Sequence, residues 1–259
     1  PTPGYDRHFK VTEHFGIEMI NVPMTEQGPD MDMVERLVSS DASIKGIWCV
    51  PKYSNPQGYT YSDETIDRFA NLKPAAPDFA IMWDNAYCVH EFDGEFEPFR
   101  DIISLCAQAG RPNMVYEFAS TSKITFPGAG ISVMATSEEN IAYHLKLISI
   151  QTISYDKVNQ LRHVKYLKNK EHTIEIMKRH AELMAPKFAV VSDALDEQIT
   201  LTVTRGDGEV ITVTYGPMNY IKRMYEKEST SDSLESVLEC LYYYHKAAEA
   251  YVDSLAAEA

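Results

Sequence analysis

The 259-residue chain is 44% hydrophobic and carries a formal net charge of −14. A chain of this length and apolar content can bury a substantial core in one large domain or two small ones. The acidic balance excludes a general nucleic-acid binder, because polyanion binding needs a dense lysine and arginine surface. We therefore expect a soluble globular protein without a nucleic-acid partner.

The cysteines and the apolar runs indicate a cytoplasmic protein. None of the four cysteines forms a Cys-x-x-Cys pair, and three lie in apolar runs, so we expect reduced thiols rather than a disulfide framework or a zinc site. We find neither a leader nor an apolar run near roughly 18 residues, and expect no secretion and no membrane span. His8, His14 and His90 are too dispersed to predict a metal site.

The first 136 residues alternate predicted strands with predicted helices. Strands are predicted over 17–22, 44–50, 79–83, 114–118 and 130–135, and helices over 31–39, 62–72 and 99–109. Such alternation predicts right-handed βαβ units and a mainly parallel sheet with helices on both faces. The expected fold class is a three-layer α/β/α core.

Beyond residue 136 the composition shifts toward helix formers and then toward alternating threonine and aliphatic residues. The first part predicts two long helices, and the second predicts a β-hairpin whose turn contains Asp207-Gly208. The predicted elements are helices over 138–154, 158–184 and 231–256 and strands over 200–204 and 209–214. We divide the chain into the α/β core over 1–136, long helices over 137–198, and a reduced or atypical small domain over 199–259.

Three polar residues follow three of the predicted strands: Asn55, Asp84 and Lys123. Ligands of open α/β sheets bind at the carboxyl ends of the strands, so we expect these three loops to converge. Lys123 lies among small hydroxyl residues, a setting that suits a lysine forming a Schiff base beside an anion-binding pocket. Taken singly, an Asn-Pro-Xaa-Gly segment is usually a turn and a loop lysine is usually a surface lysine. The occurrence of all three residues in this order, each after a predicted strand, favours a cofactor-binding site.

The side chains in these loops suit distinct roles around an aromatic cofactor. A carboxylate at a strand end, Asp84, can hold a ring nitrogen protonated, which makes the ring an electron sink. Asn55 and the phenol of Tyr87 can donate to a phenolate oxygen and lower the pKa of the imine. Ser120 and Ser122, with the backbone N–H groups of their turn, can bind a phosphate.

Four segments carry a more specific signal: 3–9 (PGYDRHF), 48–58 (WCVPKYSNPQG), 83–87 (WDNAY) and 120–130 (STSKITFPGAG). Together they resemble the fold-type I aminotransferases that use pyridoxal phosphate, and more closely a bacterial aspartate-aminotransferase-like subgroup. The resemblance extends from residue 1 to about 190. It implies pyridoxal 5′-phosphate as cofactor, with Lys123 as Schiff-base lysine and proton shuttle, Asp84 on the ring nitrogen, Asn55 and Tyr87 on the phenolate oxygen, Tyr5 stacked on the ring, and Ser120 and Ser122 on the phosphate.

The chain departs from the family pattern in two places. Typical members carry a phosphate-binding arginine about eight residues after the lysine, where this chain has Gly128-Ala129-Gly130-Ile131. The long segment that precedes Pro3 in typical members, and their C-terminal arginine for the substrate α-carboxylate, are not recognisable, so we expect a truncated chain.

Two functional hypotheses stay open. The first is an aminotransferase, acting as a homodimer, that moves an amino group from an amino acid, aspartate-like, to a 2-oxo acid through Lys123. The second is a truncated or repurposed domain of the same fold that serves as a binding or assembly module without turnover.

Overall fold

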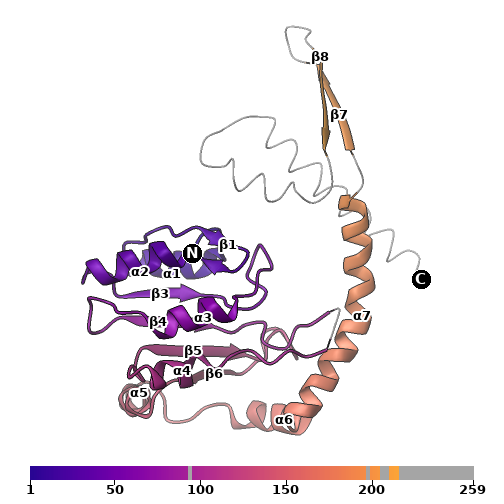
Figure 1. The fold of residues 1–259 in the computed structure, drawn as a ribbon. Coiled ribbons are helices and arrows are strands. Elements are labelled where there is room, and N and C mark those ends of the chain that lie inside the picture. Colours follow the sequence, from indigo (N-terminus) through magenta and orange to yellow (C-terminus); the bar gives the residue numbers. More distant parts are fainter. Residues whose placement is uncertain (93–94, 197–198, 205–209, 216–259) are drawn as a thin grey trace. The chain divides into compact units, whose positions relative to one another are not determined.

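The computed structural model describes residues 1–92, 95–196, 199–204 and 210–215 (Figure 1). The chain divides into two compact units, one of residues 1–90 with 95–177 and one of residues 91–94 with 178–259. The expected division at residues 136 and 198 stays a prediction. None of the helices in the described ranges combines the length and apolar character that crossing a bilayer requires.

The first unit is built on a four-stranded sheet with the strand order β3-β4-β5-β6 (Figure 1). Its strands are β3 (Gly46–Cys49), β4 (Ala80–Asp84), β5 (Val115–Ser120) and β6 (Ser132–Ala135). The first three are parallel and β6 is antiparallel to β5, which confirms the expected mainly parallel sheet. Parallel neighbours need crossover connections, and α3 (Asp63–Ala70) and α4 (Ile102–Gln108) provide them.

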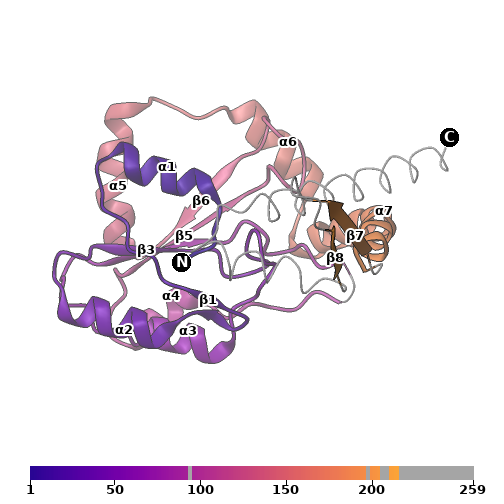
Figure 2. The ribbon, with the colours of Figure 1, turned by 90° about the horizontal axis from the view of Figure 1, so that it is seen from above.

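Helices cover both faces of this sheet (Figure 2). On one side lie α2 (Met31–Ser40), α3 and α4, and on the other lie α1 (Asp6–His14) and α5 (Glu138–Gln151). The helices α2, α3 and α4 begin at side-chain caps, as their sequences favour. Asp30 accepts the Met33 N–H at 3.0 Å, Ser62 accepts the Thr65 N–H at 3.2 Å, and Asp101 accepts the Ser104 N–H at 3.0 Å.

The apolar core of the unit includes side chains from one face of the sheet. Cys49, Ile81, Trp83 and Val115 are fully buried, and the register pairs Cys49 with Trp83 and Ile81 with Val115. Since successive strand residues point to opposite faces, the residues between them face the other side. The core therefore determines which face of each strand is left to form a binding or catalytic site.

The segment 17–22 is not a strand, contrary to the prediction. Residues 17–21 are exposed, and the pairing observed nearby is a bridge between Thr2 and Pro23, with the Thr2 N–H donating to the Val22 carbonyl at 2.8 Å. Two short strands follow, β1 (Met24–Thr25) and β2 (Gly28–Pro29). An apolar run needs a neighbouring strand to satisfy its backbone, and the sequence of the run alone cannot supply one.

The single helix predicted over 158–184 is two helices, α6 (Lys157–Leu167) and α7 (Lys170–Asp196). The backbone turns at Lys168, whose φ is 58°, and the Asn169 side chain accepts the His172 N–H at 2.9 Å as the cap of α7. Asn169 is a favourable N-cap residue and marks the start of α7, although the helical periodicity continues across it.

The second unit contains the predicted hairpin. Strands β7 (Ile199–Thr204) and β8 (Val210–Tyr215) pair antiparallel, with Thr204 opposite Val210. The turn expected at Asp207-Gly208 and the helix expected over 231–256 lie outside the described residues.

Candidate active site at the strand ends

The carboxyl ends of β3, β4 and β5 lie at one edge of the sheet, because these strands are parallel and in register. Asp84 is the last residue of β4, Ser120 is the last residue of β5, and Asn55 lies in the loop after β3. The structure thus brings the three predicted polar segments to the same edge. Pairing between neighbouring strands brings the segments to this edge.

Lys123 contacts the loop that follows β4. Its Nζ lies 3.9 Å from the centroid of the Tyr87 ring, a distance at which the ring attracts the ammonium group. Its backbone carbonyl lies 3.3 Å from His90 Nε2. At the strand ends the Asn85 N–H donates to the Phe118 carbonyl at 2.8 Å. The loops after β4 and β5 are therefore joined at the lysine and at the strand ends.

Asp84 lies in a partly desolvated environment. Burial raises the pKa of the Asp84 carboxyl, and the Trp48 indole and the Lys123 ammonium act in the opposite direction. Burial penalises the charged carboxylate, while an opposite charge nearby favours it. A further cation placed beside Asp84, such as a protonated ring nitrogen, would gain from this carboxylate more than it would in bulk water.

The two candidate phosphate ligands are already paired. The Ser120 hydroxyl donates to Ser122 Oγ at 2.9 Å, and the Ser122 N–H donates to Ser120 Oγ at 3.1 Å. Gly130 lies against this pair, because a Cβ there would clash with Ser122 Oγ and stand 2.8 Å from the Ser122 nitrogen. No side chain fits at this position unless the pair moves, so the two hydroxyls are closely packed against the backbone of Gly130.

Tyr5 and Asn55 lie on the borders of the site. The Tyr5 side chain is 45% exposed at the start of α1, and Asn55 is also exposed. Among the described residues, no hydrogen bond or ring contact joins either of them to Asp84, Tyr87 or Lys123. Gln57 Nε2 donates to the Pro3 carbonyl at 3.4 Å, so the loop of Asn55 and the segment of Tyr5 are nevertheless neighbours.

A stack of aromatic rings, which sequence reasoning did not foresee, crosses the site face of the sheet. His8 lies parallel to Trp48 with ring centroids 5.2 Å apart, and Trp48 lies parallel to Phe118 at 6.2 Å. Burial lowers the pKa of His8 to about 4, so the imidazole is neutral at pH 7. The stack holds the segment after Tyr5 over the same face as Asp84. Trp48 begins one of the four segments that carry the resemblance, but the sequence did not pair its ring with His8 or Phe118.

The family model for aspartate amino-transferase matches residues 1–210. The chain belongs to the aspartate aminotransferase family. A Mycolicibacterium smegmatis relative is 53% identical over 199 residues, and an aspartate aminotransferase from Corynebacterium glutamicum is 48% identical over 199 residues. Each match covers 77% of this chain and 46% of the relative.

Solved structures agree with this membership. The crystal structure of an aspartate transaminase from Corynebacterium glutamicum matches with a TM-score of 0.74 and 48% identity, covering 76% of this chain and 46% of that chain. The chain therefore spans about half the length of the curated aminotransferases that it matches.

The described residues of this aspartate aminotransferase family member fit the family's cofactor, pyridoxal phosphate. The cofactor needs an amine for its aldehyde, a carboxylate for its ring nitrogen and donors for its phosphate. Lys123 and Asp84 meet the first two needs, and they are close enough for the Lys123 ammonium to lower the pKa of Asp84. The Ser122 hydroxyl can meet the third as the pair stands, and the Ser120 hydroxyl can do so once it releases Ser122 Oγ.

Proposed function

We propose that this chain is the lysine-bearing part of a pyridoxal-phosphate-dependent aminotransferase that moves an amino group from an amino acid, aspartate-like, to a 2-oxo acid. The contact between Lys123 Nζ and the Tyr87 ring, at the strand edge where Asp84 lies, carries the proposal. Membership of the aspartate aminotransferase family supports the reaction class.

Pyridoxal phosphate, when bound, supplies an aldehyde that reacts with amines and a ring that withdraws electrons. Lys123 would hold the cofactor through its side-chain amine, and the same amine, when free, would remove and return the α-proton of the substrate. The contact with the Tyr87 ring restricts Lys123 Nζ, and a restricted amine would lose less entropy when it reaches the geometry for proton transfer.

The remaining residues hold and tune the ring. Asp84 would keep a proton on the ring nitrogen. Its carboxylate is partly desolvated, so it attracts a protonated nitrogen more strongly than it would in bulk water. Tyr87 and Asn55 donate to the ring oxygen, and Tyr5 stacks on the ring. Ser120 and Ser122 donate to the phosphate in place of an arginine.

The proposal extends to a cytoplasmic homodimer. Large apolar side chains on α5 are exposed, and apolar patches of this kind favour association. They are Tyr143, Leu145, Leu147 and Ile150. Size measurement by light scattering tests this part separately from the chemistry.

Covalent trapping tests the assignment of Lys123. After incubation with pyridoxal phosphate and reduction with borohydride, peptide mass analysis should find the cofactor on Lys123. The Lys123→Ala variant should carry none, whereas the control Lys146→Ala, which removes an exposed lysine of α5, should behave as wild type. Cofactor retained by Lys123→Ala at the wild-type level contradicts the proposal.

A coupled aspartate–2-oxoglutarate assay separates the two functional hypotheses. Trapped cofactor together with turnover supports the aminotransferase. Trapped cofactor without turnover of any amino acid supports the binding module.

A further inference from the structure

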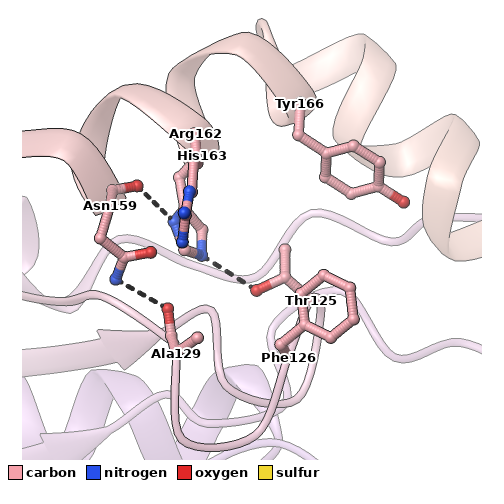
Figure 3. Close-up of a pocket in the computed structure, with 7 residues that line it drawn as sticks. All are labelled: Thr125, Phe126, Ala129, Asn159, Arg162, His163 and Tyr166. Carbon is pink, nitrogen blue, oxygen red and sulfur yellow. Dashed lines mark hydrogen bonds between the residues drawn. The ribbon is translucent and has the colours of Figure 1, made fainter.

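Helix α6 packs against the loop that carries Lys123, as Figure 3 shows. The loop leaves β5 after Ser120 and closes at its base, where the Thr121 N–H donates to the Ile131 carbonyl at 2.9 Å and the Ile131 N–H donates to Thr121 Oγ1 at 2.9 Å. Its outer part and α6 line an open pocket. The lining residues are Thr125, Phe126, Ala129, Asn159, Arg162, His163 and Tyr166.

Two polar side chains of α6 hold the loop. Asn159 Nδ2 donates to the Ala129 carbonyl at 2.8 Å. His163 is only 6% exposed, with Nδ1 2.9 Å from the Asn159 carbonyl and Nε2 3.0 Å from Thr125 Oγ1. These contacts lie on either side of the loop tip, and one of them is two residues from Lys123.

The surrounding acceptors determine where the protons are. A carbonyl can only accept, so the Asn159 carbonyl requires a proton on His163 Nδ1. Thr125 Oγ1 lies 3.0 Å from the Thr121 carbonyl as well as 3.0 Å from His163 Nε2, but its hydroxyl has one proton.

The Thr121 carbonyl is the other acceptor within reach of that proton. Its two lone pairs already accept the Ile124 N–H at 3.0 Å and the Thr125 N–H at 2.8 Å. His163 Nε2 is therefore the less occupied acceptor for the Thr125 hydroxyl, and it can accept when the imidazole carries its proton on Nδ1.

We propose that His163 is a positioning residue for Lys123: its neutral imidazole accepts the Thr125 hydroxyl and fixes the turn of residues 121–125 in which Lys123 lies. His163 acts through Thr125 and does not reach the reacting atoms. The catalytic consequence rests on the proposed function, whereas the hydrogen-bond arrangement and the order of the turn do not.

The first test needs no cofactor. Nitrogen-15 NMR of the imidazoles at neutral pH should show His163 neutral and protonated at Nδ1. Amide exchange at Ile124 and Thr125 should be at least several-fold faster in Thr125→Val, which removes the hydroxyl at nearly constant volume, than in Thr125→Ser, which keeps it. A His163 protonated at Nε2, or equal exchange in the two variants, overturns the proposal.

Substitution of the histidine itself gives a matched pair. The His163→Gln variant places an amide oxygen near the position of Nε2, whereas His163→Asn retains a donor near Nδ1 but does not reach Thr125. Exchange at Thr125 should therefore be as slow as in wild type in His163→Gln and fast in His163→Asn. The exposed His14→Gln is the control and should match wild type. Equal exchange in His163→Gln and His163→Asn counts against the acceptor role of the imidazole.

The rate at which borohydride-reducible cofactor attaches to Lys123 links the turn to chemistry. A misplacement of about 1 Å can lower a rate by up to about 100-fold, so we expect a loss of roughly tenfold or more in His163→Asn and Thr125→Val. His163→Gln and Thr125→Ser should recover most of the rate. If the turn is ordered in all variants and the attachment rates still differ, the positioning role is overturned. If no protein attaches the cofactor, wild type included, the proposed function is contradicted, and the exchange test alone decides the positioning role.

Discussion

The two faces of the four-stranded sheet differ in what they bury. On the face toward α2, α3 and α4, Ile81 and Trp83 are fully buried in the apolar core. On the opposite face the corresponding positions, Met82 and Asp84, are partly exposed, and the ring stack on Trp48 lies beside them. The chain thus changes from core to candidate site within one residue, between Trp83 and Asp84.

The difference shows how a sheet separates stability from chemistry. Complete burial stabilises the fold, but it penalises any charge that a reaction needs. Incomplete burial leaves Asp84 accessible and still raises the pKa of its carboxyl. Each of the next three predictions tests this division of roles, in order of decreasing expected effect.

Removal of a large ring from each face should have unequal effects on stability. Phe69 is fully buried and packs on Trp83 with ring centroids 5.8 Å apart, so Phe69→Ala should lower the free energy of unfolding by about 3–5 kcal/mol. Phe118 is only partly buried, and Phe118→Ala should cost roughly half of that or less. Denaturant titration of both variants measures the difference. Equal losses would mean that the second face is as much a core as the first.

The hydroxyl pair of Ser120 and Ser122 is tightly packed on the site side of the sheet. Gly130→Ala forces a methyl group against Ser122, and overpacking of this kind costs roughly 1–3 kcal/mol. The variant should also bind pyridoxal phosphate or inorganic phosphate more weakly, as titration calorimetry would show. In contrast, Ser122→Ala should weaken phosphate binding with a smaller loss of stability. A stable Gly130→Ala variant with wild-type phosphate binding would remove the hydroxyl pair from the site.

Asp84→Asn should affect binding and stability in opposite directions. The pKa of the Asp84 carboxyl is raised in the fold, so its contribution to stability is present below its ordinary pKa of 3.8 and is lost as the pH rises through the higher folded value. The cofactor-free variant should therefore be at least as stable as wild type at pH 7, by a small margin, and should lack this pH-dependent loss.

Urea titrations of both proteins between pH 4 and pH 7 measure the difference. Cofactor binding should weaken in the same variant, because a charge-assisted hydrogen bond, worth about 1.5–3 kcal/mol, is replaced by a neutral one. A variant that is less stable without cofactor and binds it normally would show that Asp84 is a structural residue.

Local signals in the sequence were sufficient for elements such as α2, α3 and β4, whose ends are determined by nearby residues. The ranges predicted for α2, α3 and β4, 31–39, 62–72 and 79–83, agree with the structure to within two residues at each end. The run 17–22 failed because a strand depends on a partner that the run does not contain, and the helix over 158–184 failed because periodicity continues across a break.

The candidate site was predicted in part. Asn55, Asp84 and Lys123 were expected at one sheet edge from their positions after strands, and the structure places their loops there. Their chemical roles remain predictions. The contacts of His8 and His163 were missed, because each joins segments about forty residues apart: His8 lies on Trp48, and His163 on Thr125.

The sequence by itself determined the family, the alternation of strands and helices, and the set of polar residues at the strand ends, because these depend on residue type and spacing along the chain. Only the tertiary structure decided which face of the sheet is core, that Ser122 leaves no room for a side chain at Gly130, and that α6 holds the loop of Lys123. These features arise from contacts between distant segments, and the energy of such contacts depends on packing in three dimensions rather than on order in the sequence.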